Sequence, residues 1–163
     1  MNKSIIKVLS VFLVTLSMMA CSSPKQNLSS YYTSKIECLG TELDGSETLL
    51  AWGTGKNKAD ALEQAKKNAV HAILFKGIVD GTGQCNKRPL MLEVNAEVKY
   101  QDYFNAFFRD NGEYKKYVSM KDTRKSSIKG EANDNQQKYS IVVRVLRAEL
   151  KEKLINDNIL KLN

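Results

Sequence analysis

The residues of this sequence whose types and spacing could do chemistry begin with a glycine- and lysine-containing stretch, Ala51 to Val70, that leads into a helical pattern. A Walker loop would need glycine and a hydroxyl residue at positions that hold Leu50 and Asn57. A dinucleotide-binding fingerprint would need a third glycine where Lys58 stands. Any helix N-terminus offers free amides to an anion, but this stretch does not predict a nucleotide site.

The same residues fit a junction between a strand and a helix. We expect Gly53 and Gly55 to let the chain turn sharply out of a strand, and Asn57 to cap the helix that follows. Asp60 can return the capping bond and favours the positive end of the helix. A row of small side chains would let this helix lie close to a sheet; it consists of Ala61, Ala65 and Ala69.

Other chemical constellations are sparse. The single histidine, His71, shares a predicted helix face with Gln64 and Lys67, so we expect it to be solvated rather than to bind a metal. The sequence contains no GxSxG nucleophile elbow, and a turn explains Asp44 and Glu47. The sequence therefore predicts no catalytic residue, no metal site and no cofactor.

Residues 1–20 have the pattern of a secretory signal, in which two lysines precede a nearly uninterrupted apolar run that ends in a small residue. The sequence MMAC, which ends at Cys21, resembles the lipobox of bacterial lipoproteins. That resemblance implies lipid attachment at Cys21 and a protein anchored to a membrane; the alternative is an ordinary secreted protein. Residues 21–33 are rich in Ser, Asn and Gln and are expected to form a tether.

The cysteines outside the N-terminal segment are Cys38 and Cys85. An exported protein tolerates disulfides, and a bridge closing so long a loop would contribute about 3 to 4 kcal/mol. Two separate buried thiols are the alternative.

The charge of the chain limits its partners. The 163 residues carry a formal charge of +7, which becomes +5 when the signal and its two lysines are removed. Because an exported protein does not meet nucleic acid as a rule, anionic lipid or cell-wall polymer is the more plausible opposite charge. The interpretation that needs no partner, and the one we prefer from the sequence, is that the basic residues are solvated side chains on one face.

The elements that must position these residues begin with a β-hairpin at residues 35–53, whose turn is predicted by Asp44-Gly45. An amphipathic helix follows from Asn57 to about Lys76. The Gly-rich residues 77–90 are expected to form an irregular loop that could be mobile. A second helix is predicted to begin with Asn95 as its N-cap and to stop at Asn111-Gly112.

The last third of the chain predicts a longer hairpin. Residues 113–130 should pair with the β-branched run at 139–146. A terminal amphipathic helix follows, with Leu150 and Leu154 one turn apart. The order β-β-α-α-β-β-α indicates a single α+β domain over residues 34–163, with one antiparallel sheet of about four strands and helices packed on a face.

Aromatic residues gather in and just after the second helix. If buried, each ring would bring about 150 to 250 Å² into the core. The competing hypothesis is a surface that binds a partner protein. The residues of that surface would be Tyr103, Phe104, Phe107, Phe108, Tyr114 and Tyr117.

Two stretches carry a resemblance to known proteins. The G-x-G followed by a helix with alanine at every fourth residue, between Thr48 and Ile78, resembles flagellum-associated envelope lipoproteins and the N-terminal domain of flagellar assembly protein T. NAEVKYQDYFNAFF with DNGEYKKYV resembles uncharacterised lipoproteins of Bacteroidetes-type bacteria. The first resemblance implies a non-catalytic accessory role at the outer membrane and transfers no catalytic residue.

Two classes of function follow. The first is a lipid-anchored envelope protein, expected at the outer membrane and facing the periplasm, that binds or scaffolds other envelope proteins. The second is an envelope hydrolase or small-ligand-binding lipoprotein that uses the Gly-rich loop around Cys85.

Overall fold

The structure, a computed structural model, describes residues 35–123, 128–132 and 137–161. The predicted signal at 1–20, the lipid attachment at Cys21 and the tether at 21–33 all lie outside the described residues.

A mixed sheet forms the centre of the described part of the chain, and the predicted α+β class is confirmed. Its strands are β1 (Ile36–Thr41), β2 (Glu47–Gly55), β3 (Asp80–Gly81), β4 (Val118–Ser119), β5 (Lys129–Ala132) and β6 (Gln137–Val145). They follow the order β3-β1-β2-β6-β4, with β5 also paired to β6. The four predicted strands are antiparallel neighbours, but the sheet gains two short strands, and β3 runs parallel to β1.

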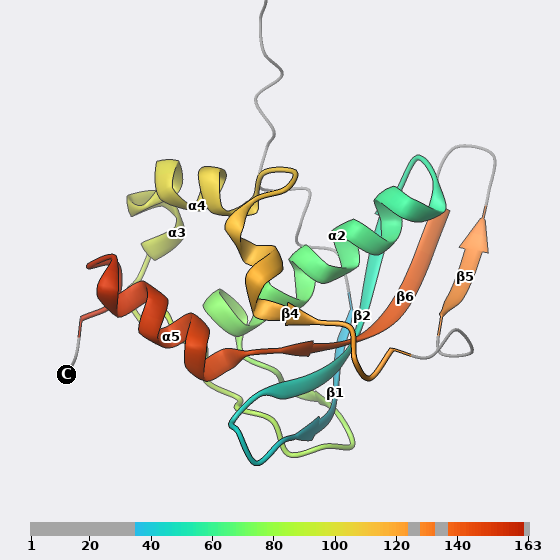
Figure 1. The fold of residues 1–163 in the computed structure, drawn as a ribbon, viewed down its shortest axis with the longest axis horizontal. Helices are drawn as coiled ribbons and strands as arrows, with labels where there is room; N and C mark the ends of the chain where they lie inside the picture. Colours follow the sequence, from blue (N-terminus) through green and yellow to red (C-terminus); the bar gives the residue numbers. More distant parts are fainter. Residues whose placement is uncertain (1–34, 124–127, 133–136, 162–163) are drawn as a thin grey trace, which may run out of the picture.

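The helices lie against one another and the sheet as Figure 1 shows. They are α2 (Lys58–His71), a π-helical extension (Ala72–Lys76), α3 (Ala96–Lys99), α4 (Gln101–Phe108), a 3₁₀ helix (Glu113–Tyr117) and α5 (Arg147–Asn156). Helix α2 packs on β2 and β6, while α3 and α4 lie at one end of it and α5 follows β6 directly. Leu150 and Leu154 are fully buried on α5, as predicted.

The first hairpin has the predicted turn. Gly45 has a φ of +77°, and the Asp44 carboxylate accepts hydrogen bonds from the amide and the hydroxyl of Ser46. These bonds lower the pKa of Asp44, the hydroxyl having the larger effect. The turn joins β1 to β2 in register, with Thr41 opposite Glu47.

The junction between β2 and α2 corrects one prediction. Gly53 and Gly55 belong to β2 and have no positive φ, so they do not turn the chain. Instead, they let β2 and the backbone of α2 approach each other closely. A Cβ on Gly53 would lie 2.2 Å from the carbonyl oxygen of Ala61, and a Cβ on Gly55 would lie 2.5 Å from the amide nitrogen of Ala61. The glycines therefore leave room for the backbone of α2.

The cap of α2 forms as predicted. The Asn57 side chain accepts a hydrogen bond of 3.0 Å from the Asp60 amide. Asp60 returns a bond by accepting from the Asn57 side-chain amide at 2.8 Å, rather than from the backbone amide. The helix then continues through the π turn to Gly77, close to its predicted end.

The second predicted helix is divided in two. Asn95 adopts a left-handed conformation, with a φ of +59°, and makes no side-chain cap, so the predicted N-cap is wrong. Tyr100 interrupts the helix between α3 and α4. The long hairpin is also shorter than predicted: residues 113–117 form a 3₁₀ helix, and among the described residues of 113–132 only β4 and β5 pair with β6.

Candidate binding cleft

The Gly-rich segment that follows α2 is held at several points. Cys38 and Cys85 form a disulfide across a separation of 47 residues, with their Cα atoms 5.8 Å apart. The Gly83 amide donates to the Cys38 carbonyl, and the Leu90 amide donates to that of Ile73. The segment is irregular, as predicted, yet these bonds tie it to β1 and to the end of α2.

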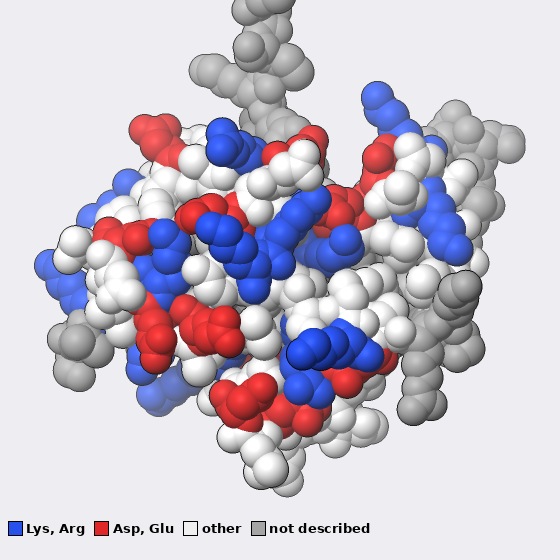
Figure 2. Space-filling model, viewed as in Figure 1, with Lys and Arg blue, Asp and Glu red and all other residues white. Residues whose placement is uncertain are grey.

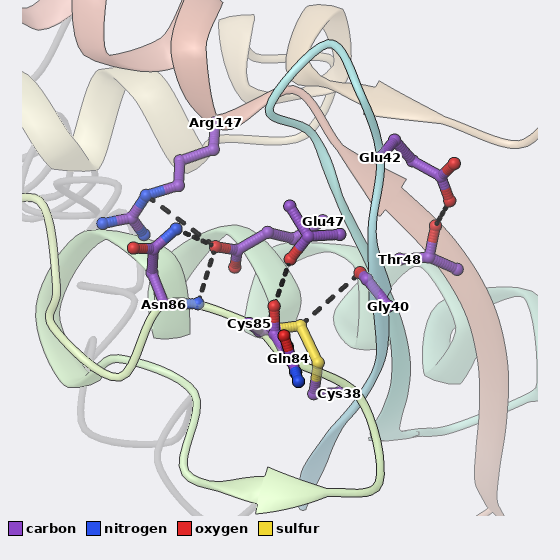
Figure 3. The surroundings of a disulfide bond; sticks show 10 residues. Cys38, Gly40, Glu42, Glu47, Thr48, Gln84, Cys85, Asn86 and Arg147 are labelled. Carbon is purple, nitrogen blue, oxygen red and sulfur yellow. Dashed lines mark hydrogen bonds and ion pairs between the residues drawn. A yellow bond between two sulfur atoms is a disulfide. The ribbon is translucent and has the colours of Figure 1, made fainter.

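Glu47 is the first functional candidate that the sequence interpretation missed. The sequence interpretation explains Glu47 by the hairpin turn at Asp44-Gly45, but its side chain is fully buried. One of its carboxylate oxygens, Oε1, accepts bonds from both the backbone amide of Asn86, at 3.0 Å, and its side-chain amide, at 2.8 Å. The other oxygen, Oε2, is buried and has no hydrogen-bond partner within the described ranges. Figure 3 shows these bonds converging from the disulfide-linked segment onto β2.

Arg147 reaches the same carboxylate from the start of α5. Its Nε lies 3.8 Å from Oε1 of Glu47, and its Nη2 donates to the backbone carbonyl of Arg88 at 2.9 Å (Figure 3). Its remaining nitrogen, Nη1, is buried and has no hydrogen-bond partner among the described residues. Burial lowers the pKa of Arg147, whereas the charge of Glu47 raises it. An unmade bond of this kind costs about 1–3 kcal/mol, and an external anion can satisfy it only after Arg147 shifts, since Nη1 has almost no exposed surface.

A cleft of about 760 Å³ opens beside Arg147, and we refer to it as the α5 cleft. Such a volume lies within the range of small-ligand sites. Its walls come from the segment after the disulfide, from the turn around Tyr100, and from α5 with the residues that follow it. They are lined by Asn86, Arg88, Pro89, Leu90, Met91, Leu92, Glu93, Lys99, Tyr100, Arg147, Lys151, Ile159, Leu160 and Lys161.

The lining of the α5 cleft is strongly cationic. Five of its side chains are Lys or Arg, and one, Glu93, is acidic. Glu93 is already engaged by Lys99 at 2.5 Å. The other exposed cations, Arg88, Lys151 and Lys161, form no ion pair with any described residue. The cleft can therefore attract and hold an anion.

Elsewhere the charges alternate in sign. On the face shown in Figure 2, lysines and arginines lie next to aspartates and glutamates. Glu63 is one example: burial raises its pKa, but hydrogen bonds from Lys66, Tyr114 and Lys115 outweigh that effect and hold the pKa at about 2. Charges paired in this way stabilise the local fold, and because they largely cancel they attract a charged ligand less strongly.

Core packing, the first of the two interpretations of the aromatic residues, holds for five of the six rings, and the competing partner surface is wrong for them. The five are buried against the core: Phe104, Phe107, Phe108, Tyr114 and Tyr117. They contact one another edge-on or stacked, as do Phe104 and Phe107 at 6.5 Å between ring centres. The rings of α4 also pack on His71 and Phe75 at the end of α2 and in its π-helical extension.

Tyr103 is partly buried at the edge of this cluster. Its hydroxyl donates to Asp157 at 2.6 Å, which ties α4 to the end of α5. Burial raises the pKa of Tyr103, and the neighbouring carboxylate of Asp157 raises it further. Tyr103 thus has a structural contact and does not form a partner surface together with the other rings.

The predicted polar face of α2 is also covered. His71 is 2% exposed, and its Nε2 lies 3.1 Å from Glu97, so the expectation of a solvated histidine is wrong. Lys67 is 4% exposed and pairs with Asp110 at 2.9 Å. Both positions face the segment from α3 to the end of α4, which lies across α2.

The described residues hold no group of three His, Cys, Asp or Glu side chains able to bind a metal ion. Within the same part of the chain, no helix is both long and apolar enough to cross a bilayer.

No known protein family, no curated protein and no solved structure matches this chain. The resemblance of residues 48–78 to flagellum-associated lipoproteins, and that of the later stretch to Bacteroidetes-type lipoproteins, therefore stay predictions.

Proposed function

We propose that this protein is a lipid-anchored, non-catalytic protein of the bacterial cell envelope, located at the outer membrane on its periplasmic side, whose folded domain binds an anionic ligand in the α5 cleft. The observation that carries the proposal is the charge of the cleft lining, which contains five Lys or Arg side chains and one acidic side chain. Envelope proteins that present such an anionic group to the cleft are further candidate partners.

Two observations support the proposed location in the cell envelope. The sequence MMAC at the end of an apolar run supports lipid attachment at Cys21. The Cys38–Cys85 disulfide supports an oxidising compartment, since such bonds persist in exported proteins and are rare in the cytosol.

Binding is favoured over catalysis by the way the charged groups are held. Glu47 is fully buried beneath Arg147 and bonded to Asn86, so it orients these two residues and does not meet a ligand itself. The hydrolase alternative placed its site around Cys85, whose sulfur is committed to the disulfide and is no nucleophile. The ligand-binding part of that alternative remains, because the same segment continues into the wall of the α5 cleft.

The anchor is tested by labelling growing cells with palmitate. We expect the full chain to incorporate the label at Cys21, to be processed in a globomycin-sensitive manner and to fractionate with the outer membrane. A Cys21→Ala protein should lose both the label and the membrane association. Equal labelling of the Cys21→Ala protein would contradict the proposed anchor.

The cleft is tested by equilibrium dialysis of the full chain held in nanodiscs of zwitterionic lipid. The probes are radiolabelled octanoate and radiolabelled inorganic phosphate, and empty nanodiscs serve as the blank. We expect saturable binding of at least one probe, weakened about tenfold or more by Arg88→Glu with Lys151→Glu. Lys56→Glu with Lys121→Glu changes the net charge equally at exposed positions outside the cleft and should leave binding unchanged. Saturable binding of neither probe would overturn the proposal.

A further inference from the structure

Several apolar side chains that line the α5 cleft are continuous with the core, and we refer to them as its apolar floor. Leu90 and Met91 are buried at 9% and 5% exposure. Tyr100, Ile159 and Leu160 are partly buried and packed against the same core. A polar group laid over these side chains would lose hydrogen bonds to water and gain none from them. The floor therefore suits an apolar chain better than a peptide backbone or a sugar.

One end of the cleft is built for an anion. Arg147 stands in the first turn of α5, where the helix dipole favours negative charge. The preceding residue, Leu146, offers no side-chain cap there. With Nε directed to Glu47 and Nη2 to Arg88, the buried Nη1 of Arg147 lacks an acceptor in the described part of the chain. A shift of the Arg147 side chain is needed before an anionic oxygen in the cleft can supply that acceptor.

The two features lie toward different ends of α5. Arg147 and Lys151 lie in the first half of α5, whereas Ile159 and Leu160 follow its end, and all four line the cleft. A ten-residue helix rises about 15 Å. A ligand with an anionic head near Arg147 could thus extend its chain along the helix, over the floor. In Figure 1, α5 forms one side of the molecule, with the end of the chain beyond it.

Resting on the proposed function, we infer that the α5 cleft binds a fatty acid: a single acyl chain whose carboxylate is held by Arg147 with Arg88 and Lys151, and whose chain lies on Leu90, Met91, Ile159 and Leu160. The carboxylate meets the exposed cations Arg88 and Lys151, which form no ion pair with any described residue, and the chain covers apolar side chains that otherwise line an open cleft.

The experiment measures dissociation constants of the full chain in zwitterionic nanodiscs for hexanoate, octanoate and decanoate, corrected with empty nanodiscs. Full burial of a methylene is worth about a fourfold gain in affinity, so we expect at least twofold per added methylene in this partly open cleft. Decanol, which keeps the chain and lacks the charge, should bind at least about tenfold more weakly than decanoate.

Two variants locate the binding. Leu160→Asn places a polar group on the floor and should flatten the dependence on chain length. Arg88→Glu with Lys151→Glu should weaken decanoate about tenfold or more, while the Lys56→Glu with Lys121→Glu control binds as the wild type does. Thermal unfolding by circular dichroism checks that each variant remains folded.

The outcomes separate the two proposals. Affinity that is independent of chain length, with phosphate bound as well as decanoate, overturns the fatty-acid site and leaves an anion site in place. Equal binding of decanol and decanoate overturns the assigned carboxylate contact, and tight binding of lysophosphatidate without decanoate overturns the choice of a carboxylate. Saturable binding of none of these probes overturns both proposals.

Discussion

Reduction of the Cys38–Cys85 disulfide should destabilise the domain and loosen the α5 cleft. The bond closes a loop with a separation of 47 residues. In the chain-entropy treatment, a loop of that length contributes about 4 kcal/mol, which is a large part of the about 5–15 kcal/mol that stabilises an ordinary domain. Reduction leaves both sulfur atoms in place, so little packing volume is lost and the effect measured is mainly that of the cross-link.

The assay is urea unfolding of the full chain, followed by the fluorescence of Trp52, with and without a thiol reductant. For a urea dependence of about 2 kcal/mol per molar, the unfolding midpoint should fall by about 2 M. Octanoate affinity, measured below the transition, should fall as well, because the segment that carries Asn86 and Leu90 loses its covalent tie to β1.

A double variant, Cys38→Ala with Cys85→Ala, provides the control. Its midpoint should match that of the reduced protein to within about 0.5 M and should not respond to reductant. Alkylation of two free thiols before any reductant is added, or a wild-type midpoint that does not move on reduction, would refute the argument that this bond holds the cleft segment.

Three further predictions concern the packing and the ion pairs of the domain outside the cleft lining. Gly53→Ala should cost about 3 kcal/mol or more in urea unfolding, since its Cβ would lie 2.2 Å from a carbonyl oxygen of α2, whereas Gly40→Ala, with nothing within 4 Å, should change stability little; equal effects would refute the close-approach role. Phe104→Ala should lower the free energy of unfolding by about 3–5 kcal/mol in the same assay, whereas the exposed Val98→Ala should lower it by about 0.5 kcal/mol or less. An unchanged stability of Phe104→Ala would contradict the burial of this ring. The pKa of Glu63 is lowered from 4.5 to about 2, so its ion pairs contribute stability that is fully present above about pH 5 and is lost as the pH falls toward 2; Glu63→Gln should remove up to about 3 kcal/mol at pH 7 and flatten that acid dependence.

Local patterns in the sequence predicted the elements whose signals are local. Asp44-Gly45 specified its turn, Asn57 its cap, and Leu150 with Leu154 the buried face of α5. Each of these depends on residues within a few positions along the chain. The β1–β2 and β5–β6 pairings followed in the same way, because each joins strands of one predicted hairpin, whereas the β2–β6 pairing that connects the hairpins joins distant segments.

Burial by distant segments could not be predicted from those patterns. His71 and Lys67 have the spacing of a polar helix face, and only the packing of α3 and α4 across α2 covers them. The aromatic period identified one helix face, but it did not say whether α5 or a partner would cover it. The sequence interpretation places Gly53 in a turn because the reason for a glycine there, the nearby backbone of α2, lies across the interface between helix and sheet.

The α5 cleft was missed for the same reason, although one signal was present. Buried positions in β2 alternate through Glu47, Leu49, Ala51 and Gly53, so period two already places Glu47 on the core side of the strand. A buried carboxylate requires partners. Its hydrogen-bond donor, Asn86, lies 39 residues further along the chain, and nothing in the local pattern pairs them.

The most direct test of the central claim is the map of amide chemical shifts when ¹⁵N-labelled full chain in zwitterionic nanodiscs is titrated with octanoate. If the α5 cleft is the binding site, the shifts will saturate and will concentrate on residues 86–93, on the first turns of α5 and on residues 159–161. Arg88→Glu with Lys151→Glu will abolish them at the same octanoate concentration. Saturating shifts centred elsewhere in the domain, or no saturable shift at all, would contradict the claim.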